Sequence, residues 1–204
     1  NLTTSDINAA AIAYKLKAAH IRAVIEVESG GGWFTDMRAD ILNLDGPGGF
    51  IDGDMPKILF EALWFHRLTN GRFTASHPKI SSNKWDKSLY VGGQNEYRRL
   101  HEAMLLDELA ALKSASWGMF QIMGFNHQLA GYSLVTDFVV AMKKSEANHL
   151  AAFLSFITNS SYQGSKLIDL LRKNDFNGFA GGYNGEGQIA LYGGKLSAAF
   201  KKYS

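Results

Sequence analysis

Apolar side chains recur three to four residues apart along most of this 204-residue chain, which is the spacing of one face of an α-helix. Alternating patterns typical of strands are sparse, and no internal repeat is visible. Because each such helix must bury its apolar face against another element, we predict a mainly α fold. The expected helices span residues 5–20, 19–28, 56–65, 94–113, 117–123, 132–142, 145–158, 165–173 and 188–202.

Two segments break this pattern. Residues 30–55 alternate glycine and aspartate with short apolar pieces, a composition that favours turns, and residues 69–93 are irregular as well. We expect the first segment to form loops with a short hairpin, as a small irregular or β lobe. The length suits one domain, so residues 1–204 are expected to fold as a single unit.

The composition excludes several classes of protein. Hydrophobic residues make up 46% and charged residues 20% of the chain, as in soluble domains with a substantial core. The formal net charge of +2 is too small to indicate nucleic-acid binding, and no apolar run is long enough for stable membrane insertion. The absence of cysteine excludes disulfides, thiolate catalysis and cysteine-ligated metals.

One carboxylate has a position that predicts a raised pKa. Glu28 ends a predicted helix just before a run of glycines, and it shares a helical stripe with Ile21, Val24 and Ile25. Burial among apolar side chains and the negative end of the helix dipole both favour the protonated carboxyl. A Glu that keeps its proton near neutral pH is suited to general acid catalysis.

The alternative is that Glu28 is an ordinary helix-end residue turned to solvent, which is the commoner situation in proteins generally. Glu26 provides a comparison within the same helix. It lies off the apolar stripe and four residues after Arg22, so an exposed ion pair accounts for it. Of these two glutamates, we therefore assign a chemical role only to Glu28.

Two further segments carry groups suited to binding sugars. Residues 116–123 (SWGMFQIM) combine a tryptophan, a glycine that permits close approach and the amide of Gln121. Residues 183–185 (YNG) follow two glycines and place a phenol and an amide on a predicted loop near the C-terminus. Each segment alone also fits ordinary core or turn sequence, but their combination with the Glu28 segment is more specific.

The three segments in this order resemble the lysozyme-like superfamily, which includes goose-type lysozymes and soluble lytic transglycosylases. A closer similarity is to the N-acetylmuramidase domain of modular phage endolysins. The matching segments are residues 23–31 (AVIEVESGG), 56–61 (PKILFE), 115–127 (ASWGMFQIMGFNH) and 183–185 (YNG). There are two departures: Ala62 and Leu63 stand where the family usually has Arg-His, and the 29–55 region is longer than in the family.

This resemblance implies a lysozyme-like catalytic domain over residues 1–204 and a peptidoglycan-degrading muramidase. Such an endolysin hydrolyses the β-1,4 bond between N-acetylmuramic acid and N-acetylglucosamine, with Glu28 as the general acid. The resemblance also implies a monomer without a cofactor, whose partner is the glycan strand. The enzyme would stay in the host cytoplasm until lysis and then reach the bacterial wall or periplasm. Modular relatives often carry a wall-binding domain as well, and the sequence leaves open whether one precedes Asn1.

Glycosidases usually need a second carboxylate, either as a nucleophile or as the base that activates water. Glu61 is the first candidate, since it shares a predicted helical stripe with Ile58 and Phe65. The alternative for this residue is a buried Glu held by a backbone amide or an arginine. Other candidates, which also fit turn positions, are Asp36, Asp40, Asp45, Asp52 and Asp54.

The resemblance assigns substrate binding and the positioning of Glu28 to Ser116, Gln121, Tyr183 and Asn184. Either Trp117 or Trp33 is expected to stack on a sugar ring, and the Tyr183 hydroxyl is expected to hydrogen-bond Glu28. The histidines show no metal-ligand spacing, so we predict no metal; among them are His66, His77 and His127.

Two other functions share most of these residues. A lytic transglycosylase uses the same acid but closes the sugar on its own hydroxyl to give a 1,6-anhydro product, whereas a wall-binding module binds without cleaving. Glu61 and the closer family similarity favour hydrolysis over transglycosylation. The apolar stripe around Glu28 disfavours the binding module, because burying a carboxyl without a chemical role is costly.

Overall fold

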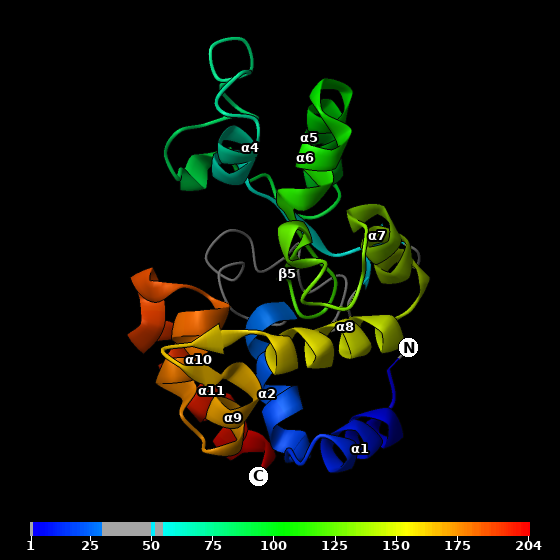
Figure 1. The fold of residues 1–204 in the computed structure, drawn as a ribbon, viewed down its shortest axis with the longest axis vertical. Helices are drawn as coiled ribbons and strands as arrows, with labels where there is room; N and C mark the ends of the chain where they lie inside the picture. The colour runs from blue at the N-terminus through cyan, green and yellow to red at the C-terminus, as the bar shows by residue number, and fades with distance from the viewer. Residues whose placement is uncertain (1, 30–49, 52–54) are drawn as a thin grey trace.

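The computed structural model describes residues 2–29, 50–51 and 55–204 of the chain. Within these residues, ten α-helices and three small antiparallel sheets form a two-lobed molecule (Figure 1). The prediction of a mainly α fold with a small β component is confirmed. Six predicted candidates lie outside the described residues: Trp33, Asp36, Asp40, Asp45, Asp52 and Asp54.

The lower lobe in Figure 1 contains most of the helices and is built around α2. The α2 side chains Ile21, Ala23 and Val24 are at most 1% exposed, because α2 packs against α1 and α11. This lobe comprises α1 (Thr4–Ala13), α2 (Ala18–Ser29), α8 (Glu146–Asn159), β6 (Ser161–Tyr162), β7 (Ser165–Lys166), α9 (Leu167–Arg172), α10 (Phe176–Tyr183), η3 (Glu186–Gln188) and α11 (Ile189–Tyr203).

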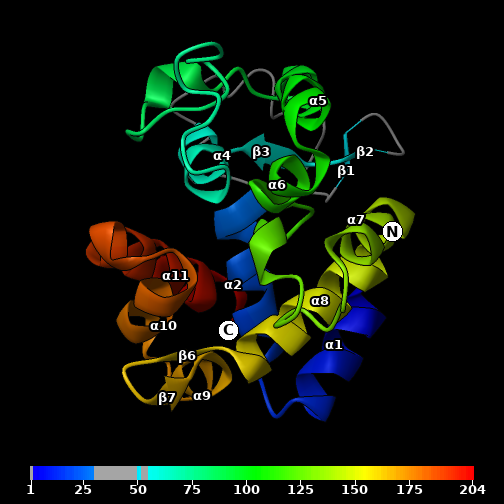
Figure 2. The same cartoon turned by 45° about the horizontal axis from the view of Figure 1, so that its top comes forward.

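The upper lobe gathers α4, α5 and β3, as Figure 2 shows from a second direction. Its helical elements are α4 (Ala62–Leu68), η1 (Lys87–Leu89), α5 (Asn95–Leu106) and α6 (Glu108–Lys113). A three-stranded sheet packs against α5 and α6. Its strands, in the order β3-β4-β5, are β3 (Ile58–Phe60), β4 (Ala115–Trp117) and β5 (Ile122–Met123). The remaining elements are β1 (Phe50–Ile51), β2 (Met55–Pro56), η2 (Gly124–Asn126) and α7 (Val135–Lys144).

Two predicted helices are wrong because strand pairing overrides the helical pattern. Residues 58–60 form β3, in which Ile58 and Phe60 are buried and pair with Trp117 and Ala115 of β4. The helix that follows, α4, begins only at Ala62. Residues 117–123 likewise belong to the β4–β5 hairpin instead of a helix: 118–121 form its turn, and Trp117 pairs with Ile122. Apolar runs this short fit a strand and a helical turn equally well, so periodicity alone does not separate them.

Other helices differ from the prediction in extent. The first helix stops at Ala13, and Lys15 adopts a left-handed φ of 53° before α2 begins. The predicted helix at 94–113 breaks at Asp107, whose carboxylate caps α6 by accepting the Ala110 N–H at 3.0 Å. Helix α10 is absent from the prediction because three glycines lower its helix propensity: Gly178, Gly181 and Gly182.

The later helices agree with the prediction to within a few residues. Ser145 is the N-cap of α8, as predicted, and its hydroxyl accepts the Asn148 N–H at 3.2 Å. The hairpin expected within 30–55 corresponds to the antiparallel pair β1–β2, in which Phe50 pairs with Pro56.

A buried ion pair holds β3 against α5. Glu96 is 0% exposed and pairs with Arg99 at 2.9 Å. The Glu96 carboxylate also accepts the backbone N–H groups of Phe60 (3.1 Å) and Val91 (2.7 Å), while Arg99 donates to the Phe60 carbonyl at 2.8 Å. The pair therefore ties the end of β3 to the segment that precedes α5.

The Glu96→Gln variant should lose about 3 kcal/mol of unfolding free energy, because it leaves the Arg99 guanidinium buried without its counter-charge. Urea unfolding followed by circular dichroism measures this loss. Asp169→Asn is the matched control: Asp169 and Arg172 have the same sequence spacing and a distance of 2.8 Å, but their side chains are 46% and 35% exposed. The control should lose less than about 1 kcal/mol. Equal losses in the two variants would contradict a structural role for the buried pair.

Candidate active site

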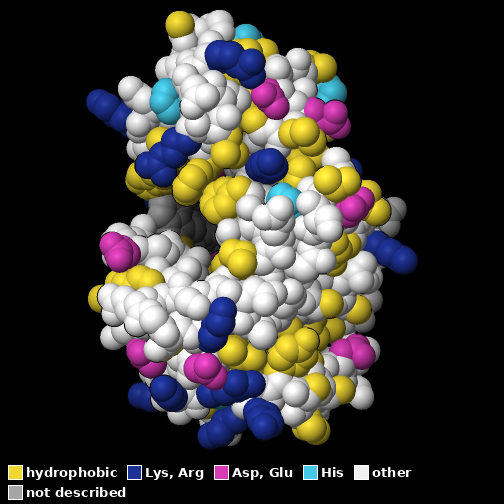
Figure 3. Space-filling model, in the orientation of Figure 1, with side chains coloured by type: hydrophobic (Ala, Val, Ile, Leu, Met, Phe, Trp, Pro, Cys, Tyr) yellow, Lys and Arg dark blue, Asp and Glu magenta, His cyan; other side chains and the backbone are white. Residues whose placement is uncertain are grey.

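Glu28 and Glu61 line one cleft of about 370 Å³. Figure 3 shows the surface hollowed on the left between the two lobes, with hydrophobic side chains gathered along the upper rim. The described residues that line the cleft are Glu28, Leu59, Glu61, Leu63, Trp64, Trp85, Ser116, Gln121, Met123, Asn184, Gly185, Gly187, Gln188 and Tyr192.

Glu28 lies in the last turn of α2, where the packed core of the lower lobe meets the cleft. The Asn184 side chain, at the C-cap of α10, donates to Glu28 Oε1 at 2.9 Å. Burial raises the pKa of Glu28 to about 7, although the Asn184 hydrogen bond and the charge of Lys195 act in the opposite direction. The carboxyl thus holds its proton close to neutral pH.

Glu26, two residues earlier on α2, has the opposite environment. Its carboxylate accepts hydrogen bonds from Lys202 at 2.7 Å and from Tyr203 at 2.5 Å, and these bonds lower its pKa. An ion pair is present as predicted, but its cation is Lys202 of α11 instead of Arg22. The pKa values of two glutamates on one helix therefore shift in opposite directions, because different groups surround them.

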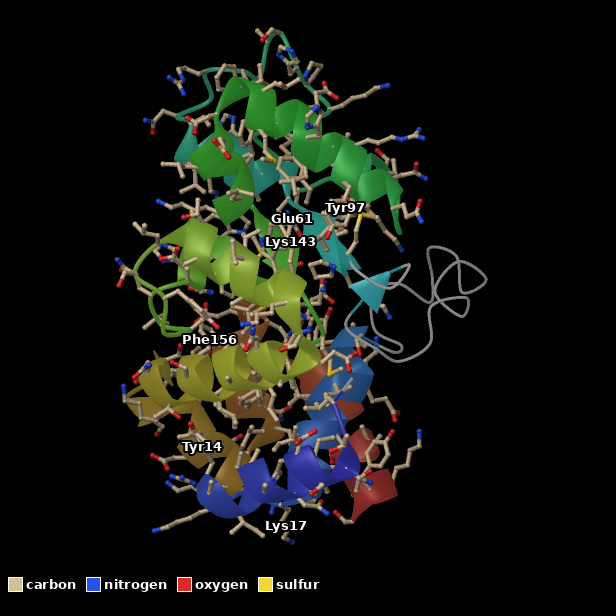
Figure 4. All side chains as sticks on the ribbon, turned by 90° about the vertical axis from the view of Figure 1, so that its right-hand side faces the viewer. Tyr14, Lys17, Glu61, Tyr97, Lys143 and Phe156 are labelled. Atoms are coloured by element: carbon tan, nitrogen blue, oxygen red, sulfur yellow. The ribbon has the colours of Figure 1, made fainter. Side chains whose placement is uncertain are left out.

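Glu61 occupies the N-cap position of α4, directly after β3. The predicted helical stripe through Glu61 is wrong, because the residues before it form a strand, but the side chain still lines the cleft. Its Oε2 atom accepts the Tyr90 hydroxyl at 2.5 Å. Burial raises the pKa of Glu61, opposed by the Tyr90 hydrogen bond and the charge of Arg99. Figure 4 labels Glu61 in the upper lobe, far from Tyr14 and Lys17 at the lower end.

Ser116 and Gln121 line the cleft from the β4–β5 hairpin. The Ser116 hydroxyl donates to Gln121 Oε1 at 2.7 Å, and Gln121 Nε2 donates to the carbonyls of Lys57 (3.2 Å) and Gly118 (2.8 Å). Gln121 has a left-handed φ of 48°, which these bonds stabilise. The amide of Gln121 thus shapes the wall of the cleft through its bonds to the backbone.

Two predicted contacts are not found where they were expected. Trp117 is 1% exposed and donates its indole N–H to the Leu112 carbonyl at 3.1 Å, so the prediction that its ring stacks on a sugar is wrong. The Tyr183 hydroxyl donates to the Phe120 carbonyl at 2.6 Å instead of to Glu28. Its ring packs among the aromatic side chains Phe153, Phe156 and Phe179, and it supports the hairpin turn from below the cleft.

Several side chains that line the cleft were not predicted from the sequence. Trp64 and Trp85 supply the aromatic surface expected of Trp117, and Gln188 and Tyr192 come from the C-terminal segment. Trp64 lies on α4, which begins at Ala62 and not at residue 56 as predicted. Trp85 lies in the irregular 69–93 stretch. No spacing rule in the sequence points to either residue.

Among the residues that the structure describes, no group of three His, Asp or Glu side chains gathers as a metal ion would require. Within the same residues, no helix has both the length and the apolar character needed to cross a bilayer.

Two carboxyl groups line one cleft, and burial raises the pKa of one of them to about 7, which is an arrangement that glycoside hydrolases use. The N-acetylmuramidase family model matches residues 17–204, so this chain belongs to the N-acetylmuramidase family. It is a peptidoglycan-degrading enzyme of the lysozyme type, and the family predicted from the sequence is confirmed.

A solved structure extends this similarity to the whole fold. The crystal structure of a Burkholderia AP3 phage endolysin matches 100% of this chain and 71% of its own, with 34% sequence identity and a TM-score of 0.78. Among curated proteins, none matches this chain.

The raised pKa of Glu28 predicts a cost in stability at alkaline pH. The pKa is about 7 in the folded protein against an ordinary 4.5, so the folded state binds this proton more tightly. The resulting stabilisation is complete below pH 4.5 and is lost as the pH rises through 7. Glu28→Gln, which is neutral throughout, should match the wild type in urea unfolding at acidic pH and exceed it by up to about 3 kcal/mol at alkaline pH.

Glu26→Gln is the control for this measurement. Its pKa is lowered in the folded state, so removing its charge should slightly reduce stability at alkaline pH, opposite in sign to Glu28→Gln. A Glu28→Gln variant less stable than the wild type at alkaline pH would contradict the raised pKa, because it would show that the folded state favours the ionised carboxylate of Glu28.

Proposed function

We propose that this enzyme hydrolyses the β-1,4 bond between N-acetylmuramic acid and N-acetylglucosamine, with Glu28 as the general acid. The observation that carries the proposal is the pKa of Glu28, raised to about 7 by burial in the cleft. An acid with such a pKa is protonated when substrate binds and still gives up its proton readily. Residues 1–204 then form a single catalytic domain.

The first step is proton transfer. Glu28 gives its proton to the glycosidic oxygen as the bond from that oxygen to the muramic acid carbon breaks, and the sugar ring develops oxocarbenium character. The Asn184 N–H, which already bonds Glu28 Oε1, remains to stabilise the carboxylate that is left behind. Lys195 contributes favourable charge to the same anion. The acid is thus buried enough to hold its proton and supported enough to release it.

The second step requires a base. In the proposed reaction Glu61 accepts a proton from a water molecule while the water oxygen bonds to the muramic acid carbon. For this role Glu61 must be ionised, and the hydrogen bond from Tyr90 and the charge of Arg99 both favour its ionised form. Proton exchange with solvent then restores the starting state of both carboxyls.

The walls of the cleft suit a glycan strand. Trp64 and Trp85 offer aromatic faces of the kind on which sugar rings pack, and Ser116, Asn184 and Gln188 offer polar groups for hydroxyl and acetamido substituents. Shape and polarity are thus both consistent with an amino-sugar polymer.

A lytic transglycosylase is the second candidate, because it needs only the acid. It would close the sugar on its own hydroxyl and leave Glu61 without a chemical role. The Glu61 carboxylate in the same cleft as Glu28 favours hydrolysis, since transglycosylation has no use for a second carboxylate there.

By similarity to the phage endolysin, we further propose that the enzyme acts at the end of a phage infection. We also propose that it acts as a monomer. It would be held in the host cytoplasm until lysis and then act on the cell wall or in the periplasm.

Mass spectrometry of the products from purified peptidoglycan tests the reaction. We expect muramic acid ends that take up borohydride, and we expect Glu28→Gln to reduce turnover about a hundredfold to ten-thousandfold while retaining the fold. Glu26→Gln, changed two residues away on the same helix, should retain turnover. Products lighter by one water and lacking the reducible end would identify a transglycosylase, and an active Glu28→Gln would remove the acid from this role.

The role of Glu61 is tested by separating turnover from binding. Glu61→Gln should lose most of kcat, because an amide does not accept a proton from water, yet it should bind insoluble peptidoglycan as the wild type does. Turnover assays paired with co-sedimentation measure the two quantities. If Glu61→Gln keeps full turnover, the base lies elsewhere or the reaction needs none.

A further inference from the structure

Two successive hydrogen bonds lead from the surface of the cleft to Glu61. Trp85 donates its indole N–H to the Tyr90 hydroxyl at 2.9 Å, and Tyr90 donates its own proton to Glu61 Oε2 at 2.5 Å. An indole nitrogen only donates and a phenol has one proton, so the direction from Trp85 through Tyr90 to Glu61 suits an ionised Glu61. Trp85 and Tyr90 flank η1, so one short segment supplies both donors.

The second bond is short. Its 2.5 Å length is compatible with a charge-assisted O–H···O⁻ bond, and such bonds are stronger than neutral ones. A donor to the Tyr90 oxygen polarises the phenol and strengthens its bond to Glu61 in turn. This relay of two hydrogen bonds, from Trp85 through Tyr90 to Glu61, therefore favours the ionised carboxylate of Glu61. Burial favours the protonated form.

Tyr90 is held in place from behind. The Arg99 guanidinium lies 5.8 Å from the centre of its ring, and the next backbone N–H groups, those of Val91 and Gly92, bind the Glu96 carboxylate at 2.7 and 3.1 Å. The phenol is only 8% exposed. It has little freedom to turn away from Glu61, so the bond exists before substrate arrives.

Trp85 has a different exposure. It is 49% exposed and lines the cleft, while its N–H edge is bonded to Tyr90. An exposed aromatic face on a cleft wall beside polar groups is the usual surface for packing a sugar ring. One residue thus offers a face to the glycan and an N–H to the relay.

Building on the proposed role of Glu61, we propose that Tyr90 is a positioning residue that keeps Glu61 oriented and ionised. We propose further that Trp85 packs on a sugar of the glycan strand while its N–H reinforces Tyr90. Substrate bound against Trp85 then contacts the same side chain that donates to Tyr90. The other charged groups that face Glu61 or Tyr90 are Arg99 and Glu96 of α5, Glu28 in the same cleft, and Lys84 and Asp86 beside the small cavity next to Tyr90.

The test is the pH profile of kcat/KM for Tyr90→Phe. The acidic limb, which reports ionisation of Glu61, should move up by about one to two pH units, since a bond to a charged acceptor is lost. The alkaline limb, which reports Glu28, should stay in place, and KM should change little. A purely structural role for Tyr90 would lower activity at all pH values without moving one limb.

Tyr97→Phe is the matched control. Tyr97 is another largely buried phenol of the upper lobe, labelled beside Glu61 in Figure 4, and it donates to the Pro56 carbonyl at 2.6 Å. Its removal costs a similar hydrogen bond but leaves the relay intact, so the acidic limb should stay at the wild-type pH. An equal shift in Tyr97→Phe and Tyr90→Phe would overturn the proposal.

Variants of Trp85 separate its ring from its N–H and remain available if Tyr90→Phe fails to fold. Trp85→Phe keeps an aromatic face and loses the N–H, so the acidic limb should rise while KM stays near the wild type. Trp85→Ala loses both and should also raise KM, by about twofold to tenfold for the loss of one aromatic contact. An acidic limb unmoved in both variants, or an unchanged KM in Trp85→Ala, contradicts the corresponding half of the proposal.

The outcome for Glu61→Gln distinguishes this inference from the function beneath it. If Glu61→Gln is inactive but Tyr90→Phe has a wild-type profile, the relay is refuted and the base remains. If Glu61→Gln is fully active, the base assignment fails and the relay loses its purpose with it.

Discussion

Desolvation of the Glu28 carboxyl depends on the burial of α2, and the chemistry of the cleft depends on both. Helix α2 packs into the core of the lower lobe against α1 and α11, so its last turn brings a carboxyl to the edge of an apolar interior. The free energy for this arrangement comes from the apolar side chains along the rest of the helix. Glu28 is thereby held in a place that an isolated helix would not choose for a charge, and its raised pKa is the consequence.

The second carboxyl is prepared by a different physical device. Glu61 follows β3, and the buried Glu96–Arg99 pair hydrogen-bonds the backbone of the last β3 residue, Phe60. Glu96 of the same pair also accepts the backbone N–H of Val91, next to Tyr90. Backbone hydrogen bonds to buried charges thus set the position of Glu61, and the Tyr90 hydroxyl favours its ionised form. Burial raises the pKa of both carboxyls in the cleft, and at Glu61 the Tyr90 hydrogen bond and the charge of Arg99 oppose that rise. The proposed acid–base hydrolysis needs such a difference between two carboxyls.

Much of this was predictable where local pattern and tertiary structure agree. The stripe that includes Ile21 and Val24 predicted α2 and the environment of Glu28, and Ser145 marked the start of α8. Prediction failed where distant segments pair: residues 58–60 are a short apolar run, residues 115–117 have a serine between two apolar residues, and only their mutual hydrogen bonds make them strands. Glu61 was found for a wrong reason, since its helical stripe does not exist. Trp117 was assigned to the cleft because exposure cannot be read from residue type.

By itself, the sequence determined the helical class of the fold, the family and the acid candidate, because these depend on periodicity along one helix and on short motifs in a fixed order. Only the tertiary structure decided which side chains share the cleft. Asn184 meets Glu28 across 156 positions of the chain, and Tyr90 reaches Glu61 across 29. Such contacts arise when separate elements pack together, so neither spacing nor residue type encodes them locally. The choice of Trp85 over Trp117 as the exposed aromatic, and of Lys202 over Arg22 as the partner of Glu26, has the same origin.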